Sequence, residues 1–265
     1  MEQMQNEKPL TKAADITAKI LTTLSPRFDE GSKPPAVKCE KCRDIGFVFV
    51  KTEYRGKLID RAQKCECRNR RARAQMIDRI PAEFRDVTVE SLRPRPSIHP
   101  GQEKAIRAIK ANPDGNFVFC GKFGSGKSHL FWALYRHAVE RGKKAYGGTL
   151  RALMDEFQKA IKLSKEGERY FPPITSEDFR QSGDSCALFL DDFDKTRATE
   201  YVTEQTFDLI DAAHSNRHQI VITTNLRIGQ LLKLLESADD FGRFGGAIVR
   251  RLLANTPDDQ LIELF

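Results

Sequence analysis

The sequence has no apolar run that approaches the 18 residues a membrane span needs, and its first ten residues, MEQMQNEKPL, lack the apolar core of a secretory signal peptide. These absences exclude an integral membrane protein and predict a cytoplasmic protein with no membrane partner. Cysteine is scarce outside one stretch, because four of the six cysteines lie within residues 39–67. Charge, in contrast, is abundant: 31% of the residues are Asp, Glu, Lys or Arg.

The composition limits both the number of domains and the class of partner. With 265 residues, 40% of them hydrophobic, the chain can bury one α/β core and a small appendage, and two equal domains are not expected. The formal charge is +7 and the isoelectric point is about 9.1, which favours a polyanionic partner. Nucleic acid is the first candidate.

Residues 121–128 read GKFGSGKS and lie between the apolar residues 117–120 and 130–134. This order predicts a strand, a glycine-rich turn and a helix, which is the context in which G-x-x-x-x-G-K-[ST] binds nucleotide phosphates. Lys127 supplies charge for the β- and γ-phosphates, and the Ser128 hydroxyl is placed to coordinate Mg²⁺. The residues expected to contact ATP-Mg²⁺ are Gly121, Lys122, Phe123, Gly124, Ser125, Gly126, Lys127, Ser128, His129 and, from a later strand, Asp191.

Two later apolar runs end in polar residues that suit nucleotide hydrolysis. Residues 186–190 are followed by Asp191 and Asp192, which predicts a Walker B strand with Asp191 in the Mg²⁺ shell and Asp192, in place of the usual Glu, polarising the attacking water. Residues 220–224 end in Asn225, which is placed like a sensor 1 residue. Solvated loop acids and a turn-forming Asn are the alternatives, and the order along the chain favours catalysis.

The clustered cysteines are spaced as two metal-binding pairs, Cys39 with Cys42 and Cys65 with Cys67. Residues 45–50 and 58–64 read as short strands, so a β-hairpin would bring both pairs together around one Zn²⁺. Four thiolates leave no open coordination position, so the metal is expected to be structural. Disulfides are the alternative, but a cytosolic chain is kept reduced.

Two segments near the cysteines suggest partners. Residues 61–79 carry seven Lys or Arg against two acids, which favours contact with a nucleic-acid backbone over a merely solvated helix face. In residues 1–35, Ala13, Ile16, Ile20 and Leu24 fall at helical spacing. That pattern suits a helix that docks either on its own domain or on a partner.

The segments GKFGSGKSHL, LFLDDFD and VITTN, followed by FGGAIVRRL at residues 244–252, occur in the order and spacing of AAA+ ATPases. Over residues 80–265 the chain resembles a DnaC/DnaI-type replicative helicase loader, a group that includes IstB transposition helpers. The cysteine module is also similar to the N-terminal part of some loaders. We therefore expect a flexible arm over 1–35, a zinc ribbon with a basic helix over 36–80, and an AAA+ ATPase core over 81–265.

The resemblance implies a five-stranded parallel sheet with flanking helices, ATP-dependent self-association, binding of single-stranded DNA and engagement of a hexameric replicative helicase. Arg251 matches the interfacial arginine that completes a neighbour's ATP site. Only 14 residues follow it, so no C-terminal lid is expected. The family often carries Arg-Tyr where Ala213-His214 stands, which puts one interface contact in doubt. The shorter acid at Asp192 implies slow hydrolysis, stimulated by DNA or a partner.

Three other functions compete with helicase loading. An IstB-like transposition ATPase would use the same core to deliver a transposase. A small-molecule P-loop kinase is disfavoured because the sequence contains no substrate lid and a kinase has no use for a zinc ribbon and a basic helix. A nucleic-acid-binding protein that holds ATP without turnover would need only the phosphate loop and the ribbon, and turnover assays with and without single-stranded DNA distinguish it from an ATPase.

Overall fold

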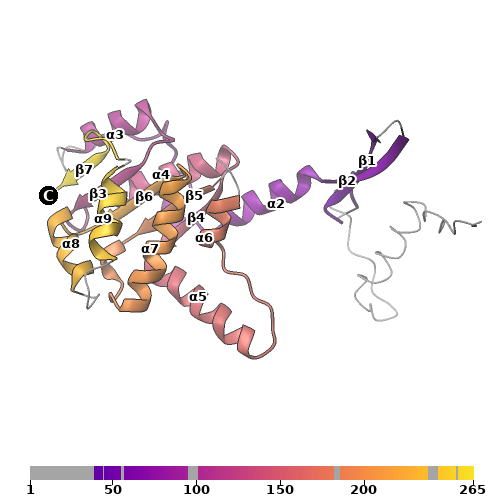
Figure 1. The fold of residues 1–265 in the computed structure, drawn as a ribbon. Coiled ribbons are helices and arrows are strands. Elements are labelled where there is room, and N and C mark those ends of the chain that lie inside the picture. Colours follow the sequence, from indigo (N-terminus) through magenta and orange to yellow (C-terminus); the bar gives the residue numbers. More distant parts are fainter. Residues whose placement is uncertain are drawn as a thin grey trace, which may run out of the picture. The chain divides into compact units, whose positions relative to one another are not determined.

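The structure is a computed structural model that describes residues 39–43, 45–54, 57–94, 101–181, 186–237, 244–254 and 256–265. The helix predicted within residues 1–35 and most of the proline-rich connector after residue 94 lie outside the described residues. The chain divides into two compact units, one ending at Arg71 and one running from Ala72 to Phe265 (Figure 1). Each is described by itself.

The smaller unit contains an antiparallel hairpin of β1 (Phe47–Tyr54) and β2 (Lys57–Lys64). The strands pair in register from Phe47 opposite Lys64 to Tyr54 opposite Lys57. The backbone bond from Cys65 N–H to the Gly46 carbonyl, at 2.9 Å, extends the pairing beyond the strands and brings the two cysteine pairs together. Helix α2 (Glu66–Ile77) begins directly after β2.

The larger unit is built on a five-stranded parallel sheet, in the order β4-β5-β6-β3-β7. The strands are β3 (Phe117–Gly121), β4 (Lys144–Thr149), β5 (Cys186–Asp191), β6 (Gln219–Thr224) and β7 (Leu261–Leu264). The helices are η1 (Ala82–Phe84), α3 (Gln102–Ala111), α4 (Lys127–Glu140), α5 (Leu150–Lys165), α6 (Ser176–Gln181), η3 (Phe193–Lys195), α7 (Glu200–Ser215), α8 (Ile228–Glu236) and α9 (Gly245–Ala254). The predicted sheet is confirmed.

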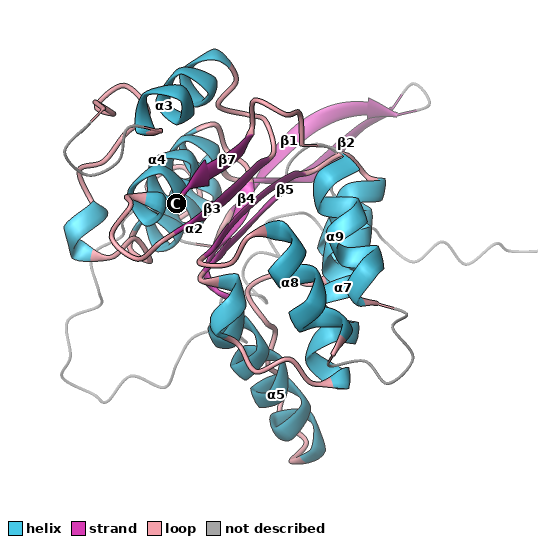
Figure 2. Ribbon diagram, turned by 90° about the vertical axis from the view of Figure 1, so that its left-hand side faces the viewer, coloured by secondary structure: helices cyan, strands magenta, loops and turns pink. Residues whose placement is uncertain are grey.

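Both faces of this sheet are covered, which explains why β3 and β6 are buried at every position and β5 at every position but its last. In β5, Ala187 and Phe189 pack into one core with α3 and α4. Leu188 and Leu190 point the other way, into a second core with α5 to α9. Figure 2 shows α3 and α4 on one side of the sheet and α7, α8 and α9 on the other.

Local signals set where the helices begin. The side-chain hydroxyls of Thr149 and Thr199 accept N–H bonds from Ala152 and Val202, so they cap the first turns of α5 and α7. Within the described ranges, no helix combines the length and the apolar character that crossing a membrane requires.

Candidate nucleotide site

The phosphate loop, the acidic pair and Asn225 come from the ends of three neighbouring strands, β3, β5 and β6. Because the strands are parallel, their carboxyl ends share one edge of the sheet, where ligands bind in open α/β folds. The chain turns from β3 into α4 through Gly124 (φ 78°) and Gly126 (φ 92°). These left-handed conformations favour glycine, so the spacing of glycines in the sequence matches what the turn needs.

Lys127 is buried at the centre of the loop. Its ammonium donates to the carbonyl oxygens of Gly121 (2.8 Å) and Lys122 (2.9 Å) and to Oδ1 of Asn225 (3.2 Å). Burial lowers the pKa of Lys127, and the nearby carboxylates of Asp192 and Asp194 oppose that shift. The phosphate loop and the end of β6 therefore position the Lys127 ammonium where nucleotide phosphates would bind.

Ser128 and Asp191 face each other across the site. The Ser128 hydroxyl donates to Oδ1 of Asp191 over 3.3 Å, and the Thr223 hydroxyl donates to the same oxygen over 2.5 Å. Burial raises the pKa of Asp191, and the Thr223 bond opposes the shift. A hydroxyl and a partly buried carboxylate are hard oxygen ligands, so the pair fits an octahedral Mg²⁺ ion.

Asp192 adopts a left-handed backbone conformation, with φ 49° and ψ 50°. Its N–H donates to the Thr223 hydroxyl (2.9 Å), while its carboxylate pairs with the ammonium of Lys195 (2.7 Å). A non-glycine residue in this region is uncommon and costs about 1–2 kcal/mol. This conformation interrupts the extended backbone, so β5 ends at Asp191 and η3 follows.

Sequence reasoning missed Asp194, which orients Asn225. One oxygen of its carboxylate accepts from the Thr224 hydroxyl (2.8 Å) and the Asn225 N–H (2.7 Å), and the other accepts from the Asn225 side-chain amide (3.2 Å). This fixes the amide so that its Oδ1 faces Lys127. The only signal in the sequence was a third acid in LFLDDFD.

Sequence reasoning also missed Gln102 and β7, which hold the loop from outside. The buried Gln102 amide donates to the Ser125 carbonyl (2.9 Å). The Lys122 N–H donates to the Leu264 carbonyl (3.1 Å), and a Cβ at Gly121 would lie 2.4 Å from that oxygen. Glycine at the end of β3 is therefore required by the close approach of β7.

The remaining loop residues differ in exposure. Phe123 is 90% exposed at the tip of the turn. Ser125 is buried, and its hydroxyl has no hydrogen-bond partner among the described residues. The ring of His129, on α4, meets the Phe84 ring edge-on, with the two ring centroids 6.3 Å apart.

Known proteins of similar structure identify the fold that carries this site. No family model matches the chain. A segment of 129 residues, 48% of the chain, is 29% identical to the chromosomal replication initiator protein DnaA of Aliarcobacter butzleri, of which it spans only 26%. The crystal structure of DnaI superposes with a TM-score of 0.53 at 15% identity, over 71% of this chain and 95% of DnaI. The chain has an AAA+ fold.

Two other structures match over similar lengths. The DnaC helicase loader gives a TM-score of 0.49 at 20% identity, covering 69% of this chain and 99% of DnaC. AMPPCP-bound DnaA from Aquifex aeolicus gives 0.49 at 18% identity, covering 71% of this chain and 51% of DnaA. The predicted DnaC/DnaI-type AAA+ fold is confirmed.

Arg251 lies on α9 of the AAA+ unit and contacts α7 of the same chain. Its Nε is 2.5 Å from Oδ1 of Asp211, and its guanidinium lies over the Phe207 ring at 4.6 Å. Both charged side chains stay partly exposed, 28% for Arg251 and 36% for Asp211, so the ion pair is worth at most about 1 kcal/mol.

Outside the AAA+ unit, the four cysteines cluster at the base of the β1–β2 hairpin. Their Sγ atoms all lie within 4.8 Å of one another, and all four side chains are buried free thiols. The Cys39–Cys65 pair is 3.8 Å apart, the spacing expected between two thiolates at about 2.3 Å from one tetrahedral Zn²⁺. The residues therefore fit a structural zinc ion, with the Gly46 N–H donating to the Cys42 sulfur (3.3 Å).

Proposed function

We propose that the chain binds ATP-Mg²⁺ at residues 121–129 and Asp191 and hydrolyses it slowly. The observation that supports this most directly is the contact of Lys127 with Asn225 (3.2 Å) and of Ser128 with Asp191 (3.3 Å). These contacts join three strand ends into one constellation of ammonium, hydroxyl, carboxylate and amide. A loop that only bound phosphate would not require side chains from the ends of β5 and β6.

Each side chain then has a distinct role. Lys127 balances the charge of the β- and γ-phosphates, and Ser128 and Asp191 hold the metal, which supplies charge neutralisation. Asp192 accepts the proton of the attacking water, and Asn225, held by Asp194, orients that water. Arg251 of a neighbouring copy stabilises the transferring phosphoryl group.

We further propose that the ATPase acts in DNA replication as a helicase loader that binds single-stranded DNA, a hexameric replicative helicase and other copies of itself. The support is the net charge of +7, the fold shared with DnaI and the segment shared with DnaA. The hairpin and its cysteines serve as a zinc-stabilised ribbon in this proposal. An IstB-like transposition helper, with the same core, is the alternative.

The nucleotide-binding proposal is tested with Lys127→Ala, measured by titration with a fluorescent ATP analogue. Binding should be abolished, because this is the buried ammonium at the centre of the loop. Lys104→Ala is the control and should bind like the parent, since it removes an exposed lysine on α3 outside the phosphate loop. If Lys127→Ala binds like the parent, the assignment is wrong.

Turnover and partner are tested separately. Asp192→Asn should retain binding and lose hydrolysis, because an amide cannot accept the proton of the water. Recovery of a replicative helicase with the full chain from the native cell supports loading, and recovery of a transposase supports the alternative.

A further inference from the structure

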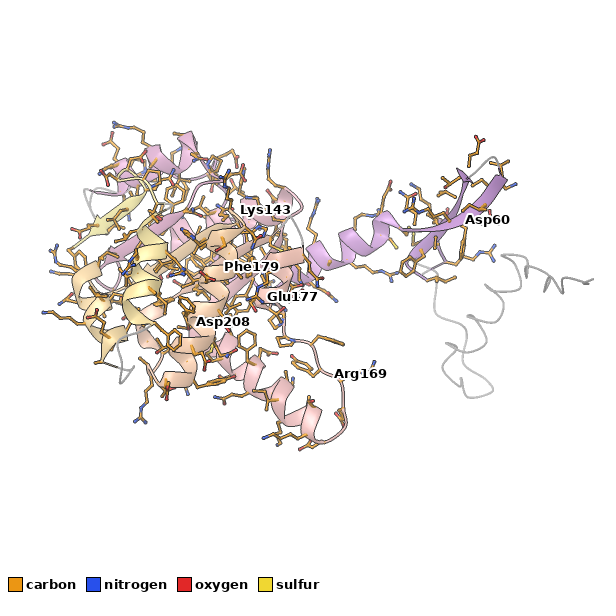
Figure 3. The ribbon with its side chains drawn as sticks, viewed as in Figure 1. Asp60, Lys143, Arg169, Glu177, Phe179 and Asp208 are labelled. Atoms are coloured by element: carbon orange, nitrogen blue, oxygen red, sulfur yellow. The ribbon has the colours of Figure 1, made fainter. Side chains whose placement is uncertain are left out.

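A pocket of about 530 Å³ lies at the opposite edge of the sheet from the nucleotide site, where the strands begin. It includes Lys143, labelled in Figure 3, which precedes β4, and Gln219, the first residue of β6. Its polar lining is completed by Asp114, Arg141, Arg217 and His218. None of these residues takes part in the proposed ATP chemistry.

The floor of the pocket is tied by hydrogen bonds. The Lys143 ammonium lies 2.9 Å from both Oδ1 of Asp114 and Oε1 of Gln219. The Gln219 amide donates to the carbonyls of Pro113 (3.0 Å) and Gly115 (2.9 Å). Asp114, the one acid in the lining, is therefore already engaged by Lys143.

The rim carries two further arginines, of which Arg141 makes only a long ion pair with Asp114. Arg217 is exposed, and within the ranges the structure describes its guanidinium makes no hydrogen bond or ion pair. The Arg141 side chain is 63% exposed and comes no closer than 3.8 Å to Asp114. A guanidinium Nη2 of Arg73 lies 4.0 Å from the position of a Cβ on Gly142, which adds a further cation beside the pocket.

The backbone conformation at Arg217 is a second, independent observation that suggests a role for the Arg217 side chain. Helices α4 and α7 end in the same way: Gly142 N–H bonds to Val139 and Arg217 N–H bonds to His214, each at a left-handed residue. At Gly142 (φ 86°) this residue is glycine, as the geometry favours, whereas Arg217 (φ 56°) accepts the strain of a side chain. A strained arginine on the rim of a basic pocket points to a ligand.

We propose that this pocket binds a backbone phosphate of single-stranded DNA, with Arg217 and Arg141 as the contacting residues. Guanidinium groups match phosphate oxygens in charge and fork geometry. Lys143 and Asp114 keep the floor rigid. The inference deepens the DNA-binding part of the proposed function and does not depend on ATP chemistry.

The experiment is a fluorescence-anisotropy titration of a labelled oligothymidylate with the full chain, without nucleotide, over a range of salt concentrations. Arg217→Gly should weaken binding roughly fivefold at low salt and reduce the slope of log affinity against log salt by about 0.7, the value of one lost phosphate contact on a single strand. Its thermal unfolding midpoint should equal or exceed that of the parent, because glycine relieves the left-handed strain. Lys104→Ala, which removes an exposed charge on α3 outside the pocket, should neither weaken binding nor change the slope against salt.

The outcomes separate the possibilities. Equal losses in Arg217→Gly and Lys104→Ala would mean diffuse charge and would overturn the site, as would parental binding by Arg217→Gly. If Arg217→Gly loses calorimetric binding of inorganic phosphate but not of the oligonucleotide, the ligand is a free phosphate and the DNA proposal fails. If the parent binds no DNA at all, the DNA part of the proposed function fails with it, whereas the Lys127→Ala test of ATP binding stands unaffected.

Discussion

Gly126→Ala should destabilise the AAA+ unit by two separable mechanisms. Gly126 has φ 92°, a conformation that alanine enters only with strain. A Cβ there would also lie 2.4 Å from Nε2 of Gln102, the atom that donates to the Ser125 carbonyl. Because the clash is with the end of a flexible side chain, we expect the Gln102 amide to move and its hydrogen bond to break.

The magnitude follows from these two parts. The backbone strain costs about 1–2 kcal/mol, and the loss of one buried hydrogen bond costs about 1 kcal/mol. Gly126→Ala should therefore lower the free energy of unfolding by about 2–3 kcal/mol. Gln102→Met, which retains the bulk of the side chain but lacks the donor, should cost about 1 kcal/mol.

A double-mutant cycle tests this reasoning. Urea unfolding is followed by the fluorescence of Trp132, which is the single tryptophan of the chain and is buried in α4. The double variant should cost no more than Gly126→Ala alone, because the same hydrogen bond cannot be lost twice. That gives a coupling of about 1 kcal/mol between the two sites.

Gly124→Ala is the matched control. Gly124 has φ 78°, but no atom lies within 4 Å of its Cβ position. It should show the backbone strain alone and no coupling to Gln102→Met. Additivity of Gly126→Ala with Gln102→Met to within about 0.5 kcal/mol would refute the clash.

Three other predictions concern the metal, pH and the neighbouring subunit. Elemental analysis should find one zinc per chain, and chelation should expose four further reactive thiols; a zinc-free chain with those thiols protected would contradict the ribbon. Burial raises the pKa of Asp191, so ionising this carboxyl lowers the free energy of unfolding as pH rises from the pKa of the unfolded chain through the raised folded pKa. Asp191→Asn should therefore be more stable than the parent at neutral pH. In urea unfolding measured over a range of pH, this advantage should disappear below the pKa of Asp191 in the unfolded chain. Arg251→Ala should bind ATP yet lose turnover, and mixing it with Lys127→Ala should restore part of the activity; unimpaired, concentration-independent turnover would exclude a role in trans, and Asp211→Asn, which only releases Arg251, should remain active.

The residues that we propose to carry chemistry could be located from the sequence because each belongs to a short local pattern. The phosphate loop is eight consecutive residues whose glycines match the observed left-handed turns. Asp191 is the last residue of β5 and Asn225 directly follows β6, and parallel pairing brings those strand ends together without further information. The hairpin was likewise predictable, since the cysteine pairs flank it closely.

Strand β7 was not predictable in this way. Its four residues, Leu261–Leu264, carry no motif, and they pair with β3, which lies far upstream, with Leu261 opposite Val118. So short an apolar segment fits a helix end or a loop equally well. Its role is decided by the free edge of β3, a feature of the assembled sheet and not of the segment.

The supports of the site share this non-local character, and they explain how a short motif becomes a rigid geometry. The Leu264 carbonyl binds the start of the phosphate loop, Gln102 binds its middle, and Asp194 fixes the amide that meets Lys127. Each support comes from an element that the motif does not contain. The eight-residue loop thus specifies which groups the proposed site offers to phosphate, while β7, α3 and η3 fix the positions of those groups. A substitution at any of the three supports should therefore disturb nucleotide affinity even though the motif itself is intact.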